Sequence, residues 1–354
     1  MVHDINKLLK LMVERKASDL HITAGAPASL RVDERLVPID DKVLSPADAK
    51  DIIYSMLSDS QKEKFESDLE LDMAFGIQNL GRFRVNVFRQ RDSVGTSIRL
   101  IPNEIWPFEK CGLPVKVVID LCNRPKGLVL VTGATGSGKS TTLASMIDWI
   151  NSNRACHIVT IEDPIEFIHT NKKAIVNQRE VYSDTHSFGG SLKHVLRQDP
   201  DVILIGEMRD LETIESALII AETGHLVFAT LHTSDCVQTI NRIIDVFPAY
   251  QQQQIRTQLS FVMVGALSQQ LIPRAKGTGR ALATEVMIVT PAVRSLVRES
   301  KLHQIYSIIQ TSQKDGMKTM NQALYELCQN KIISYEEAVD RSTDPEDLNR
   351  LFKR

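Results

Sequence analysis

One segment limits what this chain can fold into, because a glycine-rich turn lies between an apolar run and a stretch with helical periodicity. The apolar run covers residues 128–131, and the turn follows it directly. Apolar side chains then recur at the spacing of one helix face, at Leu143, Met146, Ile147 and Ile150. This order predicts a strand, a tight loop and a helix.

The turn matches the pattern G-x-x-x-x-G-K-[ST], in which each fixed position has a physical reason. Glycines let backbone amides approach a polyphosphate, and the N-terminus of the helix adds a partial positive charge. Lys139 would reach the terminal phosphates, and the Ser140 hydroxyl would complete the shell of a Mg²⁺ ion. We predict a nucleoside triphosphate site, the alternative being a turn that binds nothing. The predicted cradle consists of Gly133, Ala134, Thr135, Gly136, Ser137, Gly138, Lys139, Ser140 and Thr141.

Composition narrows the class of protein. The 354 residues favour two or three domains, and the formal net charge of −2 shows no excess of Lys and Arg for a nucleic-acid surface, although a local basic patch is compatible with it. The five cysteines form no C-x-x-C pair, which favours reduced thiols over a zinc knuckle or a disulfide framework. Met1 leads into a charged helix, and the longest mostly apolar stretch, residues 259–267, is too short to span a bilayer. We therefore expect a soluble intracellular protein.

Residues 1–100 have the pattern of a small α+β domain. Helical spacing predicts a first helix over residues 5–13 and a second helix from Ser45, which caps it. Strand-like runs fall at residues 19–23, 29–32, 71–77, 82–88 and 96–101.

Arginines occupy one face of the predicted strand 82–88. Apolar and polar residues alternate there, so one face carries the core while Arg84, with Arg99 on the next strand, belongs to the other face. Two interpretations are open: a solvated outer face, or cations that point at an anion. Because this domain has no phosphate loop of its own, the anion would be the nucleotide of a neighbour.

The pattern changes after residues 101–114, which contain three prolines and are predicted to be a linker. Between residues 115 and 354 strands and helices alternate, which predicts an α/β domain with a parallel sheet flanked by helices. Residues 290–354 are predicted to be mostly helical. Strands are predicted at residues 128–132, 157–161, 202–205 and 226–231, and a helix at residues 211–222.

Two acidic clusters follow predicted strands. Glu162, Asp163 and Glu166 follow one strand, and Glu207 follows another. Parallel strands deliver their carboxyl ends to one edge of the sheet, so these groups should lie beside the phosphate loop and serve γ-phosphate hydrolysis. The second cluster resembles a Walker B element, but Gly206 stands where an aspartate is usual, so direct Mg²⁺ ligation by this strand stays open. The alternative role for either cluster is helix capping.

His225 and His232 bracket the predicted strand 226–231. Seven residues of extended chain separate them by roughly 23 Å and turn them to opposite faces, so they are not a joint metal site. His232 ends its strand on the side of the loop and is the better candidate for sensing the γ-phosphate. A structural role explains His225 equally well.

Five segments taken in order resemble the type IV pilus retraction motors of the secretion ATPase superfamily. They are GATGSGKST, TIEDPIEF, ILIGEMRD, ETGHLVFATLHT and AVRSLVRES. The resemblance covers essentially the whole chain. It implies a PAS-like N-terminal domain, a RecA-like ATPase domain, and a homohexamer that binds ATP between the domains.

The resemblance also implies roles for the loop and the acidic residues. Lys139 and Ser140 hold the phosphates and Mg²⁺, Glu166 is the general base, and Glu207 belongs to the Walker B element. The implied partner is a platform protein of the inner membrane, at whose cytoplasmic face the motor works. Direct binding to nucleic acid is not expected, and the membrane is reached only through partners.

The same resemblance also implies roles for four basic residues. His225 and His232 form the histidine boxes, while Arg84 and Arg99 reach the nucleotide as arginine fingers. Residues 292–299 match a motif associated with retraction rather than with ATP binding. Pilus-extension and type II secretion ATPases carry a further N-terminal domain and a four-cysteine zinc insertion, and neither is expected here.

Two other functions are compatible with the same predicted ATP-binding domain. A nucleic-acid translocase is disfavoured by the neutral charge balance. A regulatory module that binds ATP without useful turnover is left open by Gly206.

Overall fold

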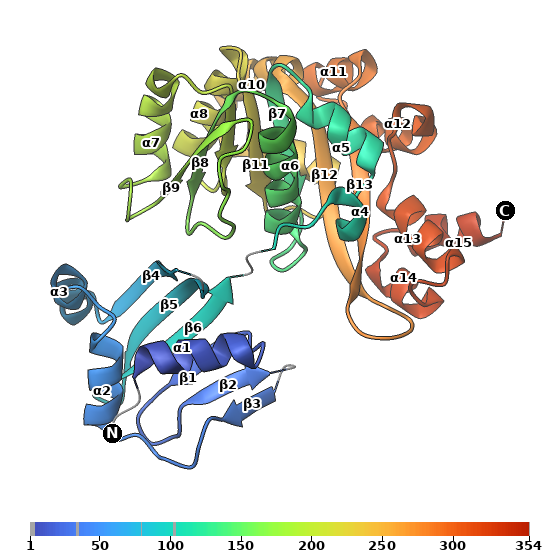
Figure 1. The fold of residues 1–354 in the computed structure, drawn as a ribbon. Coiled ribbons are helices and arrows are strands. Elements are labelled where there is room, and N and C mark those ends of the chain that lie inside the picture. Colours follow the sequence, from blue (N-terminus) through green and yellow to red (C-terminus); the bar gives the residue numbers. More distant parts are fainter. Residues whose placement is uncertain (1–3, 33–34, 79, 102–103, 354) are drawn as a thin grey trace. The chain divides into compact units, whose positions relative to one another are not determined.

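The computed structural model describes residues 4–32, 35–78, 80–101 and 104–353. The chain divides into two compact units, Met1–Glu104 and Ile105–Arg354, called here the N-terminal and C-terminal units (Figure 1). Each unit combines a sheet with helices, and the C-terminal unit ends in a helical region. The predicted class, an α/β domain preceded by a smaller α+β domain, is confirmed.

Within its described residues, the N-terminal unit has an antiparallel sheet in the order β3-β2-β1-β6-β5-β4. The strands are β1 Asp19–Ile22, β2 Ser29–Val32, β3 Arg35–Pro38, β4 Glu70–Ile77, β5 Gly81–Gln90 and β6 Ser93–Ile101. The helices are α1 Ile5–Glu14, α2 Pro46–Tyr54 and α3 Asp59–Asp68. Ser45 caps α2 through a reciprocal pair of hydrogen bonds with Asp48, as its sequence position predicts.

The two faces of this sheet differ in polarity. Phe83, Val85 and Val87 of β5 are fully buried in one cluster with the apolar faces of α1 and α2. On the opposite face, Arg84 of β5 pairs in register with Arg99 of β6, and Arg99 pairs with Asp19 of β1. The predicted alternation in β5 is confirmed.

The C-terminal unit is built on a sheet in the order β13-β12-β7-β11-β10-β8-β9, parallel except that β13 is antiparallel to β12. Its strands are β7 Gly127–Thr132, β8 His157–Glu162, β9 Ile175–Glu180, β10 Val202–Ile205, β11 Leu226–Leu231, β12 Met263–Pro273 and β13 Arg280–Ile288. β7 lies between β11 and β12, so the strand that leads into the phosphate loop is buried along its whole length.

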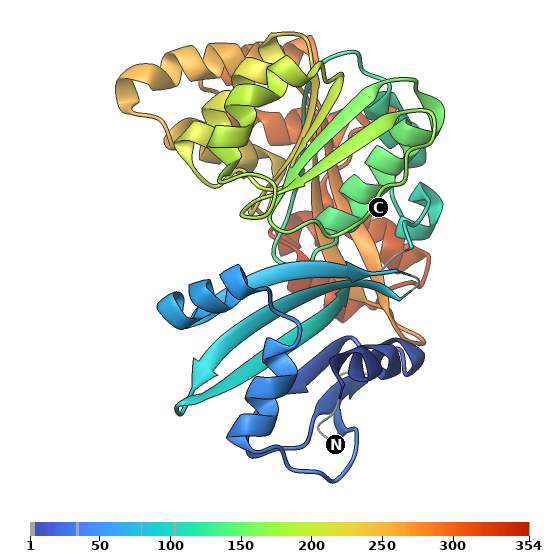
Figure 2. The same ribbon diagram turned by 60° about the vertical axis from the view of Figure 1, so that its left-hand side comes forward.

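Helices cover both faces of this sheet (Figure 2). Leu128 and Leu130 of β7 pack with helices of one layer, whereas Val129 and Val131 pack with helices of the other. The first layer contains α7 Phe188–Val195, α8 Leu211–Glu222, α9 Cys236–Asp245 and α10 Ala249–Val262. The second contains α4 Phe108–Cys111, α5 Val115–Cys122 and α6 Lys139–Asn153.

The C-terminal helical region follows β13. It consists of α11 Pro291–Arg298, α12 Ile305–Thr311, α13 Met320–Gln329, α14 Tyr335–Arg341 and α15 Pro345–Phe352. α13 and α15 pack through Leu324 and Leu348 onto Ile272 of β12 and Ala283 of β13. No helix in the described ranges has both the length and the apolar character that crossing a membrane requires.

One buried carboxylate joins this region to the α/β core. Glu285 of β13 accepts a hydrogen bond from the Cys236 amide at 2.8 Å and another from the Met320 amide at 3.3 Å. These amides open α9 and α13, so neither has an acceptor within its own helix. Burial raises the pKa of Glu285, although both amides favour its charged form.

The structure differs from the sequence-based expectation in two places. Residues 102–103 of the predicted linker lie outside the described residues, but residues 105–114 belong to the C-terminal unit, where Phe108 of α4 is buried. The Ser145 hydroxyl of α6 also donates to the Trp106 carbonyl at 2.7 Å. Strands β3, β9, β12 and β13 were not predicted, since β3 is fully exposed and β9 contains the polar run Asn-Gln-Arg-Glu.

Replacing Glu285 by alanine should lower the free energy of unfolding of the C-terminal unit by about 2–4 kcal/mol, because two buried amides lose their acceptor. Both tryptophans, Trp106 and Trp149, lie in this unit, so urea denaturation followed by tryptophan fluorescence reports on it. Glu326→Ala is the control, since Glu326 of α13 makes a surface ion pair with Lys318, which precedes this helix, and the substitution should change stability by less than about 1 kcal/mol. Equal effects of the two substitutions would contradict the prediction.

Candidate active site

The phosphate loop joins the end of β7 at Thr132 to the start of α6 at Lys139. Gly133 has φ +142°, and a Cβ there would lie 2.5 Å from both the Gln269 carbonyl oxygen and Ser137 Oγ, so only glycine fits. Gly138 has φ +92° and no side chain caps α6. The first amides of α6 therefore remain donors for an anion, as in other phosphate-binding loops.

Lys139 closes this loop on itself. Its Nζ donates to the carbonyl oxygens of Gly133 at 2.9 Å and Ala134 at 3.0 Å, and its side chain is buried. Burial lowers the pKa of Lys139, while the charges of Glu207 and Glu166 act in the opposite direction. Both predicted carboxylates therefore lie within electrostatic range of the cradle.

The first acidic segment begins where β8 ends. Glu162 Oε1 accepts hydrogen bonds from Thr160 Oγ1 at 2.7 Å and from Gln178 Nε2 at 3.2 Å. Burial raises the pKa of Glu162 to about 7, although these bonds and one from the Glu166 amide favour its charged form. Asp163 is exposed and precedes a cis peptide bond to Pro164, which leads to Glu166.

The second acidic segment follows β10, where Gly206 replaces the usual aspartate. A Cβ at Gly206 would lie 3.2 Å from the Cα of Glu162 and 3.3 Å from the Ile161 carbonyl oxygen, which is tighter than most real contacts. The Gly206 amide also donates to Ile161 at 2.8 Å, and its carbonyl accepts from Thr230 at 2.6 Å. The glycine therefore lets β10 approach β8 closely, which accounts for the missing aspartate.

Glu207 is held by two basic side chains. Arg209 contacts it with two nitrogens, Nε at 2.7 Å and Nη2 at 2.8 Å, and His232 Nε2 lies 3.3 Å from Glu207 Oε1. Burial alone would raise the pKa of Glu207, but the hydrogen bond from Arg209 and the charges of His232 and Arg209 outweigh it, so the pKa is lowered. His232 thus stands beside the acidic group, on the side of the sheet where the phosphate loop lies.

His225 lies at the end of β11 opposite the phosphate loop of its own chain. Its carbonyl accepts from the Gly127 amide, which begins β7 at the edge of the sheet opposite the phosphate loop. Its Nδ1 lies 3.1 Å from Thr223 Oγ1 and 3.2 Å from the Ile220 carbonyl oxygen. The structure therefore favours the structural interpretation of His225.

The two arginines of the N-terminal unit differ in their surroundings. Arg99 Nε donates to Asp19 Oδ1 at 2.8 Å. Burial tends to raise the pKa of Asp19, but hydrogen bonds from Ser18 and Arg99 and the Arg99 charge outweigh it, so the pKa is lowered. Arg84 is exposed, and its side chain makes no hydrogen bond or ion pair to the residues that the structure describes. Arg84 is therefore the cation more available to an outside anion.

A family model described as Type II/IV secretion system protein matches residues 1–339. The chain belongs to this family of type II/IV secretion system proteins. It is 47% identical over 345 residues to the Type IV pilus retractation ATPase PilT of Pseudomonas aeruginosa, covering 98% of this chain and 100% of that protein. It is 44% identical over 349 residues to a protein of Neisseria gonorrhoeae described as Twitching motility protein, with 99% and 93% of the two chains covered.

A solved structure of the pilus retraction motor PilT with bound ADP is similar to this member of the type II/IV secretion system family. The TM-score is 0.93 and the identity 51%, with 98% of this chain and 99% of the other covered. The cradle described above fits a nucleotide, because uncapped amides, a buried lysine and the partly exposed Ser140 hydroxyl meet at one helix start. No cluster of three or more acidic, histidine or cysteine side chains suited to a metal occurs among the described residues, so Mg²⁺ would depend on the phosphates and Ser140.

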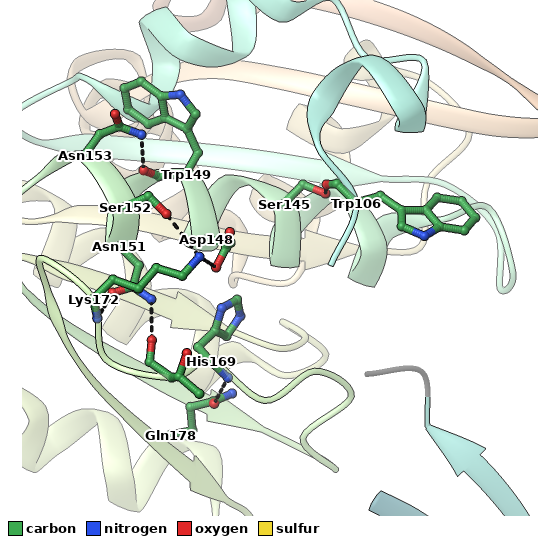
Figure 3. Close-up of polar contacts among 11 residues, drawn as sticks. Trp106, Ser145, Asp148, Trp149, Asn151, Ser152, Asn153, His169, Lys172 and Gln178 are labelled. Atoms are coloured by element: carbon green, nitrogen blue, oxygen red, sulfur yellow. Dashed lines mark hydrogen bonds and ion pairs between the residues drawn. The ribbon is translucent and has the colours of Figure 1, made fainter. Parts of the chain in front are cut away.

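Several residues of this site carried no recognisable sequence signal. Gln178 and Asn151 hold the segment after Glu166 from two sides, and Lys172 pairs with Asp148 of α6 at 2.6 Å (Figure 3). Arg209 lay within the quoted motif ILIGEMRD but was given no role. Asn and Gln side chains that bind backbone groups follow no fixed spacing, so their partners emerge only from the fold.

The motif at residues 292–299 lies in α11, away from the phosphate loop. Arg294 lines a cavity of about 320 Å³ at the opposite edge of the sheet, together with Lys126, Gly127 and Glu222. Arg298 lies over the ring of the exposed Phe261, 5.8 Å from its centre. This motif therefore contributes no group to the nucleotide cradle.

Glu162 should make the stability of the C-terminal unit depend on pH. A carboxyl whose pKa is about 7 in the folded state and near 4.5 when exposed favours folding below its unfolded pKa, and loses this contribution as the pH rises through 7. Glu162→Gln should therefore flatten the decline in stability between about pH 4.5 and pH 7, measured by urea denaturation at several pH values. A variant profile as steep as that of the wild type would mean that another group titrates.

Proposed function

We propose that this chain is an ATPase that forms a homohexameric motor and powers the retraction of type IV pili. One arrangement carries the proposal: the buried Lys139 stands at the uncapped start of α6, and the acidic segments after β8 and β10 leave the parallel sheet at the same edge as the phosphate loop. This arrangement occurs in a chain similar along its whole length to a pilus retractation ATPase and to a pilus retraction motor with bound ADP.

ATP binds with its phosphates against the first amides of α6. Lys139 exchanges the carbonyl oxygens of Gly133 and Ala134 for phosphate oxygens, which opens the loop. Ser140 and the phosphates would hold Mg²⁺, which would supply positive charge against the charge that develops on the transferred phosphoryl group. Glu166 takes a proton from water as the water oxygen bonds to the γ-phosphorus and the bond to the bridging oxygen of ADP breaks.

Glu207 and His232 respond to the γ-phosphate. The carboxylate is oriented by Arg209 and lies beside His232, so a phosphate that arrives at Lys139 changes the electrostatic field of both. Arg84 supplies positive charge to the nucleotide of a neighbouring subunit, with Arg99 as the alternative if its bond to Asp19 breaks. The site of one subunit is then completed by the next.

The motor works at the cytoplasmic face of the inner membrane. It passes its motion to a platform protein, so that pilin subunits leave the base of the fibre. The net charge of −2 supports a protein partner over nucleic acid, and the membrane is reached through that partner.

Substitutions at the cradle should separate binding from turnover. Lys139→Ala should lose nucleotide binding, whereas Glu166→Gln should bind a fluorescent ATP analogue normally and hydrolyse ATP about 100-fold or more slowly, because the general base is gone. The measurements are Mg²⁺-dependent phosphate release and analogue titration. Full activity in both variants would refute the site, and slow wild-type hydrolysis with retraction preserved in Glu166→Gln would favour a regulatory module.

Subunit mixing tests the role of Arg84. Arg84→Ala alone should lower turnover by about 100-fold or more. Mixed rings with Lys139→Ala subunits should regain measurable ATPase activity, since intact Arg84 then faces intact loops. Arg89→Ala is the control, because Arg89 lies on the other face of β5 and pairs with Glu66. Arg84→Ala activity equal to the wild type would overturn the assignment.

A further inference from the structure

The Glu166 carboxylate makes no hydrogen bond to the part of the chain that the structure describes, so its position is set by its backbone. That backbone lies in an irregular segment between β8 and β9. General-base catalysis requires the acceptor oxygen within hydrogen-bond reach of the attacking water. The residues that bind this segment therefore determine the position of the Glu166 carboxylate.

The side-chain amide of Gln178 in β9 binds the backbone of two residues in this segment, Phe167 and His169. Its Nε2 donates to the Phe167 carbonyl at 2.8 Å and to Glu162 Oε1 at 3.2 Å, and its Oε1 accepts from the His169 amide at 2.8 Å. One side-chain amide thus pairs with both groups, much as a neighbouring strand would.

We propose that Gln178 is a positioning residue that holds the segment carrying Glu166 in place for proton transfer. The inference rests on the proposed role of Glu166 as general base. Gln178 acts through its bonds to the backbone of Phe167 and His169, and its further bond to the Glu162 carboxylate fixes the side-chain amide at the end of β8. The anchor is part of the fold itself, because the bonds to Phe167 and His169 are made by a side chain of the sheet.

A second anchor ties the chain just after this segment to α6, the helix that begins at the phosphate loop (Figure 3). Asn151 of α6 is fully buried, donates to the Thr170 carbonyl at 2.8 Å, and accepts from the Lys172 amide at 3.1 Å. Its own carbonyl accepts from the Lys173 amide at 2.9 Å. Since α6 begins at Lys139, the chain that follows the base and the phosphate cradle are attached to the same helix.

Gln178→Ala should lower kcat for ATP hydrolysis about 10-fold while KM and binding of a fluorescent ATP analogue change less than about twofold. Asn177→Ala is the matched control, because Asn177 is the preceding residue of β9 and its side chain contacts His157, away from the segment. It should leave kcat within about twofold of the wild type. Unchanged kcat in Gln178→Ala, or a parallel loss of nucleotide binding, overturns the inference.

Gln178→Glu gives a second readout if the alanine variant folds poorly. It keeps the length and an acceptor for His169, but it donates to the Phe167 carbonyl only when protonated, beside the carboxyl of Glu162. Its kcat relative to the wild type should therefore rise as the pH falls from about 8 to about 6. A ratio independent of pH contradicts the positioning role.

A double substitution separates this inference from the proposed function. If Gln178 acts through Glu166, Gln178→Ala should cause no further loss of kcat in a Glu166→Gln background. Full activity of Glu166→Gln would refute the base and with it this inference. Loss of activity in Glu166→Gln together with full activity in Gln178→Ala would refute the role of Gln178 alone.

Discussion

The buried ammonium of Lys139 is the group on which the organisation of the C-terminal unit depends. A cation in a partly apolar environment needs oxygen partners, and here it finds two loop carbonyls, with Glu207 and Glu166 close enough to favour its charge. Those carboxylates are delivered by β8 and β10, which must therefore end beside β7. Three features bring these charges together. They are the parallel order of the sheet, the glycine that lets β10 approach β8, and the start of α6 without a side-chain cap.

The sequence allowed the class of fold and the centre of the site to be predicted, because these follow from local patterns. The loop before α6, the four central strands and the alternation in β5 depend on neighbours in the chain. Long-range partners were beyond such patterns. Nothing near Arg99 indicated its bond to Asp19, which lies 80 positions away. His225 shares a motif with His232, yet it lies at the other end of β11, where its side chain contacts the last turn of the preceding helix α8. The polar strand β9 was missed for the same reason, and Gln178 with it.

Polar side chains that bind the backbone of another element recur through the C-terminal unit. Glu285 binds the first amides of two helices, Asn151 binds the segment after Glu166, and Gln178 binds that segment from its other side. Apolar contacts bring these elements together but tolerate sliding, whereas a hydrogen bond with one donor and one acceptor fixes register. The apolar layers thus supply stability, and a few amide and carboxylate groups fix how the catalytic segments align.

The bond between Ser145 and Trp106 has a mechanical consequence. Ser145 lies in the second turn of α6, which begins at Lys139, and its hydroxyl is bonded to the carbonyl of Trp106, the second residue of the C-terminal unit. The first residues of the C-terminal unit are therefore bonded to α6, the helix whose start forms the phosphate cradle. A shift or rotation of that helix would therefore be felt at Trp106, close to the point where the chain enters the C-terminal unit.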